Sequence, residues 1–275
     1  MNFSVLMSLY YKEIPEYLNE CLASIDRQSL KPTECIIVFD GPVGDKLEDV
    51  VEFWKKKLNI KVCRLEKNVG LGNALNEGLK FCNYELIARM DTDDICHSLR
   101  FERQIGYMVN HPDIIVLGSS IAEFNKEIFD SDVYRVVPFK YKAILKYYKM
   151  KSPFNHMTVV FRRSIILSNG GYMHHHLMED YNLWLRIISK GYKVENIPEV
   201  LVYARIGNNM ISRRRGWKYV ISEYYLAKLK ISLNIQSYAA SYSTFFIRAL
   251  PRLLPVFLLS YVYRLNRSKS IYKKD

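Results

Sequence analysis

Residues 3–90 alternate short apolar runs with segments of helical periodicity. The apolar runs are Phe3–Leu9, Glu34–Asp40, Ile60–Leu65 and Glu85–Met90, and the helical segments between them are Pro15–Gln28, Lys46–Leu58 and Gly70–Cys82. Alternation of strand and helix patterns predicts βαβ units and a mainly parallel sheet with helices on both faces. We therefore expect an α/β fold with a Rossmann-like sheet.

Polar residues follow three of the four apolar runs. Tyr10 and Asp40 come directly after the first two runs, and the acidic segment Asp91–Asp94 comes after the fourth. Ligands of open parallel sheets bind outside the carboxyl ends of the strands. The sequence therefore places three candidate ligand contacts on one edge of the sheet.

The segment Asp91-Thr92-Asp93-Asp94 has two interpretations. Carboxylates this close repel one another unless a cation or hydrogen-bond donors compensate them, and Mg²⁺ and Mn²⁺ prefer carboxylates together with substrate phosphates. One interpretation is a site for a metal–diphosphate complex. The other is an acidic loop in which Asp93 or Asp94 caps the next helix.

Three further segments carry weaker signals. Asp40-Gly41 is a common turn pair. The glycines of Asn68–Ala74 open a helix, where they would let an anionic ligand approach the backbone. Glu179-Asp180 begins an amphipathic helix over Glu179–Lys190, so these acids either complement the helix dipole or provide a general base.

The second half of the chain predicts a mixture of elements. Strands are expected at Ile114–Phe124, within Pro153–Phe161, at Tyr192–Ile197 and at Leu201–Ile206, and a helix runs from the basic loop Arg213–Arg215 to Asn234. Phe245–Tyr263 is apolar but contains two arginines and two prolines. This pattern favours an interfacial amphipathic helix over a membrane-spanning one, and a helix packed on the rest of the chain is the alternative.

The net charge of +12 is unevenly distributed along the 275 residues. From about Arg213 onward the chain is rich in Arg and Lys and poor in acids, whereas the acidic clusters lie in the first half. This asymmetry favours a basic tail on an enzyme over a nucleic-acid-binding protein. The five scattered cysteines indicate a reducing compartment. Phe3–Leu9 is typical of a buried strand rather than a signal peptide, so a cytoplasmic location is expected.

Taken together, the ordered motifs resemble the family 2 glycosyltransferases with the GT-A fold, over Phe3 to about Ser212. The motifs are Ser4–Tyr11, Asp40-Gly41, Asn68–Gly72, Met90–Asp94 and Glu179–Trp184. The chain is also similar to bacterial O-antigen and exopolysaccharide enzymes of the amylovoran type. The segments that carry this second likeness are Leu9–Glu13, Pro153–Thr158 and Val202–Asn208.

The resemblance implies a role for each matching position. Nucleotide-sugar contacts are expected from Ser8, Tyr10, Asp40, Asn68, Gly70, Asp91, Asp93 and Arg205. Asp94, with Asp93, would hold Mn²⁺ or Mg²⁺; Asp180 would be the catalytic base with Glu179 beside it; and His156 and Trp184 would face the acceptor. Many relatives carry a histidine near the diphosphate after the last strand. Arg205-Ile206-Gly207-Asn208 has none, so Arg205 or Arg213–Arg215 would neutralise that charge.

The resemblance also implies a reaction and a domain arrangement. Residues 1–212 would form the catalytic domain, with 1–98 binding the nucleotide sugar and 99–212 the acceptor, and residues 213–275 a basic, helical, membrane-associating tail. An inverting enzyme would move glucose, or next galactose, from a UDP-sugar to an undecaprenyl-diphosphate-linked GlcNAc. The product would be a β-1,3 linkage, made at the cytoplasmic face of the inner membrane.

Other classes of protein fit less well. A nucleic-acid-binding module would need a basic ligand edge, and this edge is acidic. An inactive scaffold would not need the acids at 91, 93, 94 and 180, and a nucleotidyltransferase would carry a basic, glycine-rich loop near Ser8–Glu13. Three adjacent histidines, His174–His176, cannot all face one ion, so a lid on the acceptor side is preferred over a metal site.

Overall fold

The computed structural model describes residues 1–125, 128, 133–206, 215–255 and 268–269. The strands are β1 Ser4–Leu9, β2 Glu34–Phe39, β3 Ile60–Arg64, β4 Leu86–Arg89, β5 Ile95–Cys96, β6 Ile114–Phe124, β7 Val133–Arg135, β8 Val160–Arg162, β9 Lys193–Arg205 and β10 Ser268–Lys269. The helices are α1 Pro15–Asp26, α2 Asp45–Lys55, α3 Leu71–Phe81, α4 Arg100–Asn110, α5 Tyr141–Tyr147, α6 Arg163–Ser168, α7 Glu179–Ser189, α9 Trp217–Ser232 and α10 Tyr238–Ala249, with short 3₁₀ turns η2 His156–Thr158 and η3 Leu250–Leu253.

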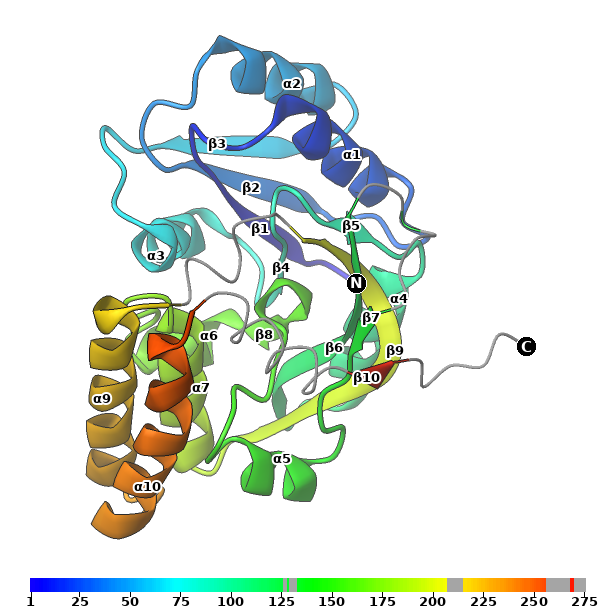
Figure 1. The fold of residues 1–275 in the computed structure, drawn as a ribbon. Coiled ribbons are helices and arrows are strands. Elements are labelled where there is room, and N and C mark those ends of the chain that lie inside the picture. Colours follow the sequence, from blue (N-terminus) through cyan, green and yellow to red (C-terminus); the bar gives the residue numbers. More distant parts are fainter. Residues whose placement is uncertain (126–127, 129–132, 207–214, 256–267, 270–275) are drawn as a thin grey trace.

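One curved sheet organises the molecule (Figure 1). Its strand order is β10-β7-β6-β8-β4-β1-β2-β3, with β9 paired to both β5 and β6. The strands β4, β1, β2 and β3 are parallel neighbours, as the alternation of the first ninety residues predicts. Next to this parallel half, β8 runs antiparallel to β4, and β6 runs antiparallel to β8. The predicted α/β fold with a Rossmann-like parallel half is confirmed.

The two faces of the sheet bury two separate apolar cores. Val5 and Met7 of β1 face a core that α1, α2 and α4 cover, whereas Leu6 faces a core that α3, α6 and α7 cover. Successive side chains of a strand point to opposite faces, so a strand buried on both sides must be apolar throughout. This is why the run from Phe3 to Leu9 contains no charged residue.

The prediction of two strands between Tyr192 and Ile206 is wrong, because β9 is one continuous strand. Its register against β6 shifts where Ile197 pairs with Ser119 and Val200 pairs with Ser120. The two residues between them, Pro198 and Glu199, bulge out of the pairing. A bulge bends a strand without ending it, so the turn-like proline does not interrupt β9.

The helices α9 and α10 form a hairpin that packs against α7 (Figure 1). Glu223 of α9 is 1% exposed and accepts hydrogen bonds from Nε and Nη2 of Arg248 on α10, at 2.6 and 2.9 Å. Lys230 is also buried and donates to the carbonyl of Lys149 at 2.6 Å. Buried polar contacts thus join α9 to α10 and, through Lys230, join the hairpin to the rest of the chain.

The predicted interfacial helix Phe245–Tyr263 is only partly within the described residues. Its first part is the end of α10 and the turn η3, and residues 256–263 lie outside the described ranges. Among the described helices, none combines the length and the apolar character that crossing a bilayer requires.

Glu223 provides a stability test of the hairpin. Removing one partner of a buried ion pair leaves the other charge buried and uncompensated, so we expect Glu223→Gln to lower the free energy of unfolding by about 3–5 kcal/mol. The exposed pair Glu77–Lys80 is the control, and Glu77→Gln should cost less than about 1 kcal/mol. Urea unfolding measures both. Equal stabilities for the two variants would contradict a stabilising role of the buried Glu223–Arg248 pair.

Candidate active site

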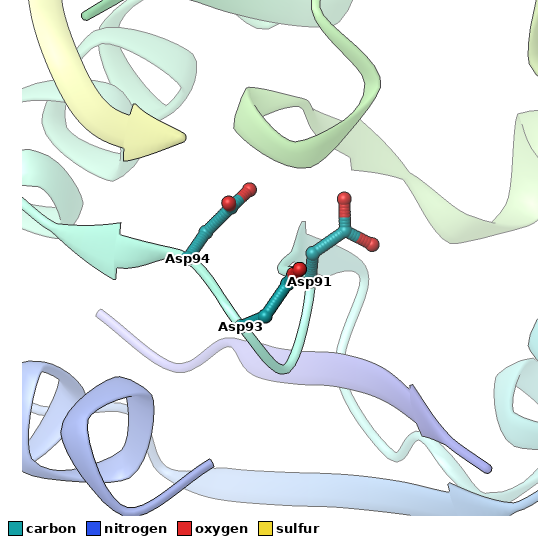
Figure 2. A group of neighbouring side chains, drawn as sticks. All are labelled: Asp91, Asp93 and Asp94. Atoms are coloured by element: carbon teal, nitrogen blue, oxygen red, sulfur yellow. The ribbon is translucent and has the colours of Figure 1, made fainter. Parts of the chain in front are cut away.

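Three carboxylates lie together in the loop between β4 and β5. One oxygen from each of Asp91, Asp93 and Asp94 lies within 4.8 Å of the other two. Figure 2 shows the three side chains projecting to the same side of the loop. This spacing lets a single ion touch all three carboxylates, whereas the same three charges repel one another when no cation lies between them.

Two arginines hold the acidic loop in place. Arg89, on β4, is buried and forms an ion pair with Asp91. Arg205, at the end of β9, donates its backbone N–H to Asp94 Oδ1 at 2.9 Å and its Nε to the carbonyl of Asp93 at 3.1 Å. The Arg205 side chain also pairs with Glu20 and lies over the ring of Tyr17. Its guanidinium is therefore engaged in positioning the loop.

The second oxygen of Asp94 is the best-supported metal ligand atom. Asp94 is 2% exposed, and its Oδ2 has no hydrogen-bond partner among the described residues. Burial and the charges of Asp91 and Asp93 raise the pKa of Asp94 well above its usual value. Burial and Asp91 also raise the pKa of Asp93 to about 6. An orphaned buried carboxylate oxygen among like charges fits a hard divalent cation.

The predicted nucleotide contacts lie on the same edge of the sheet. Tyr10 directly follows β1, and Asp40 directly follows β2. The backbone N–H of Asp40 donates to the carbonyl of Leu9 at 2.8 Å. Asp40 is buried, and its two carboxylate oxygens accept the N–H groups of Val69 and Gly70 at 2.6 and 3.1 Å. Asp40 thus fixes the glycine-containing loop before α3, and each oxygen keeps a second lone pair for a ligand.

Ser8 and Asn68 lie around the same edge. Ser8 is the penultimate residue of β1 and is half-buried, whereas Asn68 is exposed in the loop before α3. The Asn68 side-chain amide donates to the carbonyl of Asp40 at 3.3 Å. The structure therefore brings Ser8, Asn68 and Asp40 to one edge, together with Tyr10 and Gly70.

The start of α7 meets this edge from the second half of the chain. A Cβ built on Gly72 would lie 3.2 Å from Cγ of Glu179 and 3.3 Å from Cβ of Tyr172, so a larger residue here would crowd the start of α7. Burial raises the pKa of the Tyr172 phenol; Arg89 opposes this shift, and the charges of Asp180 and Asp91 add to it. The charges of the acidic loop and of Asp180 thus both act on the Tyr172 phenol.

The ring of His156 contacts the rings of both Tyr172 and Trp184. His156 Nε2 is 2.8 Å from the Tyr172 hydroxyl, and removal from water together with Arg89 lowers the pKa of His156 well below its usual value. Trp184 is fully buried, with its ring centroid 5.2 Å from that of Phe154 and 6.2 Å from that of His156. Of the two predicted acceptor contacts, Trp184 is therefore part of the core, whereas His156 keeps some exposed surface.

No role was expected for Arg89 or Tyr172 from the sequence alone. A signal existed for Arg89, because residues two apart on a strand point to the same face and Arg89 precedes Asp91 by two. Tyr172 has no comparable signal, since its position depends on how α6 and α7 pack. His175, within the histidine run, is buried and is bonded to the Ser222 carbonyl of α9 at 2.9 Å, so it anchors its loop.

The raised pKa values predict how stability depends on pH. An acid whose folded pKa is raised stabilises the fold while it is protonated; this contribution is complete below the unfolded pKa of about 4. It is lost as the pH rises through the folded pKa, which is about 6 for Asp93. At pH 7.5, without metal, we expect Asp94→Asn to raise the free energy of unfolding by at least about 1 kcal/mol. Urea unfolding from pH 4 to 8 measures this, with exposed Asp49→Asn as the control; a destabilised Asp94→Asn protein would contradict it.

Comparison with known proteins gives this geometry a family. The model of glycosyl transferase family 2 matches residues 4–168, and that of glycosyl transferase family group 2 matches residues 101–268. The amylovoran biosynthesis glycosyltransferase AmsE of Erwinia amylovora is 45% identical over 96% of this chain and 99% of its own. The UDP-Gal:alpha-D-GlcNAc-diphosphoundecaprenol beta-1,3-galactosyltransferase of Escherichia coli is 40% identical over 95% of each chain.

Solved structures agree with the fold. Residues 1–349 of S. aureus TarS, in complex with UDP-GlcNAc, superpose with a TM-score of 0.68 at 21% identity, covering 92% of this chain and 72% of that one. The mannosyltransferase PcManGT of Pyrobaculum calidifontis superposes with a TM-score of 0.59 at 15% identity, covering 96% and 80%. At these identities the likeness shows the fold alone, and it confirms the predicted GT-A fold. The chain belongs to glycosyl transferase family 2.

Proposed function

We propose that this glycosyltransferase moves a hexose, with inversion, from a UDP-sugar to a sugar on a lipid diphosphate during exopolysaccharide or O-antigen synthesis, using a divalent cation. The observation that carries the proposal is that two acidic segments act on one side chain. Asp91, Asp93 and Asp94 form one segment, Asp180 belongs to the other, and the charges of Asp91 and Asp180 both raise the pKa of Tyr172. One segment suits a metal–diphosphate complex and the other suits a base.

The donor side is assigned to the edge of the parallel strands. Tyr10 and Asp40 lie at the ends of β1 and β2, where the uracil ring would bind, and Asp91 and Asp93 would face the nucleoside. Asp94, together with Asp93, would hold Mn²⁺ or Mg²⁺. When bound, the cation neutralises charge that develops on the departing diphosphate. The structural likeness to TarS, which was solved with UDP-GlcNAc, supports a UDP-sugar donor.

The acceptor side is assigned to the start of α7. Asp180 would accept the proton of the attacking hydroxyl as general base. Glu179 beside it is half-buried, and burial raises its pKa, so it keeps a proton more readily and can donate a hydrogen bond to the acceptor. Attack from the face opposite the diphosphate, in one displacement, inverts the anomeric carbon.

The relatives of this chain suggest which sugar, acceptor and linkage to expect. Glucose and galactose are the candidate sugars, and the 40% identity to a galactosyltransferase favours keeping galactose beside glucose. The same relative acts on GlcNAc-diphosphoundecaprenol and forms a β-1,3 linkage. We assign the same acceptor class and linkage here, which places the reaction at the inner membrane with the enzyme peripherally bound.

Asp180→Asn separates the base from donor binding. Loss of general base catalysis reduces a rate by about 100- to 10,000-fold, and the acids of the donor side stay intact. We expect transfer to fall at least about 100-fold while the dissociation constant for UDP with Mn²⁺ stays unchanged. Mass-spectrometric rates and calorimetric titration measure the two, with exposed Asp49→Asn as the control. Wild-type transfer by Asp180→Asn would remove the base role.

A donor screen tests the reaction itself. Purified protein with Mn²⁺ and a synthetic GlcNAc-diphosphate-lipid is incubated with each UDP- and GDP-hexose in turn, and product masses are read. We expect one added hexose from UDP-glucose or UDP-galactose, and no product after EDTA. Transfer from a GDP-sugar, or undiminished transfer in EDTA, would overturn the donor or the metal assignment respectively.

A further inference from the structure

An apolar surface covers the outside of the α9–α10 hairpin. Of the 21 large hydrophobic side chains that are exposed among the described residues, nine belong to residues 215–255. Trp217, Ile221 and Tyr225 recur every four residues along α9, with 69%, 50% and 57% exposed. Phe246 at 56% and Leu250 at 60% follow on α10 and η3. We call these five residues the hairpin face.

Aromatic contacts join the two helices beneath the hairpin face. The ring of Tyr224 lies 6.1 Å from that of Phe245, which in turn lies 5.1 Å from Phe246. Tyr224 and Tyr242 are also in ring contact at 6.4 Å. These ring contacts join α9 to α10 beside the exposed residues of both helices. Apolar patches of this kind on a soluble fold mark interaction sites.

The exposed charged side chains of residues 215–255 are all positive. Glu223 is the only acidic residue in the sequence 215–255, and it is buried against Arg248. The exposed charged residues of the same stretch are Arg215, Lys218 and Lys228. Cations without exposed acids, beside aromatic and aliphatic side chains, complement an anionic lipid surface.

A groove at the start of α9 adds to this complementarity. It has a volume of about 400 Å³ and is lined by Arg215, Gly216, Trp217, Arg252 and Leu253. Two arginines with an exposed tryptophan and leucine match the boundary between phosphate headgroups and acyl chains.

The hairpin is connected to the acceptor side of the site. The carbonyl of Ser222 on α9 bonds to His175, and the Ser222 hydroxyl donates to the carbonyl of His176 at 2.9 Å. Glu179 and Asp180 follow His176 after only two intervening residues, Leu177 and Met178. The position of α9 and the position of the base are therefore set by one loop.

We propose that the hairpin face, with Arg215, Lys218 and Lys228, docks this enzyme onto an anionic lipid bilayer. The docking rests on the proposed function only for its purpose, which is to bring Asp180 to a membrane-bound acceptor. The surface itself is argued from exposure and charge.

Binding to vesicles without any sugar substrate tests the proposal. Full-length protein is sedimented with vesicles of phosphatidylglycerol and phosphatidylcholine mixed, or of phosphatidylcholine alone. Each large apolar side chain contributes on the order of 1.5 kcal/mol or more when buried, so the triple variant Trp217→Ser, Tyr225→Ser, Leu250→Ser should bind mixed vesicles at least about tenfold more weakly. Lys218→Gln with Lys228→Gln should weaken binding about fivefold or more.

The matched control is Phe53→Ser, Phe81→Ser, Val109→Ser, whose side chains are 53%, 49% and 47% exposed on α2, α3 and α4. We expect it to bind mixed vesicles like the wild type, and all variants to retain wild-type melting temperature and UDP binding. Equal binding by the hairpin triple and the control would overturn the proposal. So would concentration-dependent dimers that the hairpin triple abolishes, because a second copy would then cover the face. Neither result depends on which sugar the enzyme transfers.

Discussion

The crowding of three carboxylates within 4.8 Å at the end of β4 is the constraint around which the site is built. Like charges at this distance destabilise the folded chain unless positive charge compensates them. The protein supplies part of that compensation from β4 through Arg89, and part from the far end of β9 through Arg205. The Oδ2 atom of Asp94 is left without a partner among the described residues. Part of the repulsion therefore stays uncompensated by the described residues, and the proposed cation would compensate it.

The two halves of the chain have different tasks in this arrangement. The parallel strands of the first half bring Tyr10, Asp40 and the acidic loop to one edge, because parallel strands end at the same side of a sheet. The second half returns to that edge twice, once through β9 with Arg205 and once through α7 with Asp180. Gly72 on α3 leaves room for Glu179 at the start of α7. The proposed donor and acceptor sides thus lie where the two halves of the chain meet.

Much of this could be predicted from the sequence, because local patterns carry it. The strands and helices of residues 3–90 follow from apolar periodicity, and the acidic edge follows from strand ends. The continuous strand β9 could not be predicted, since Pro198 resembles a turn and only pairing with β6 absorbs it. Tyr172 likewise depends on tertiary packing. The burial of Glu223 with Arg248 could not be predicted either, because it depends on how α9 packs against α10.

We propose that the acidic loop holds a divalent cation together with the donor diphosphate. Electron paramagnetic resonance of Mn²⁺ titrated into the protein, with and without UDP, measures this directly. We predict one tightly bound Mn²⁺ per chain when UDP is present, lost in Asp94→Asn and kept in Asp49→Asn. Equal Mn²⁺ binding by wild type and Asp94→Asn in the presence of UDP would contradict the account.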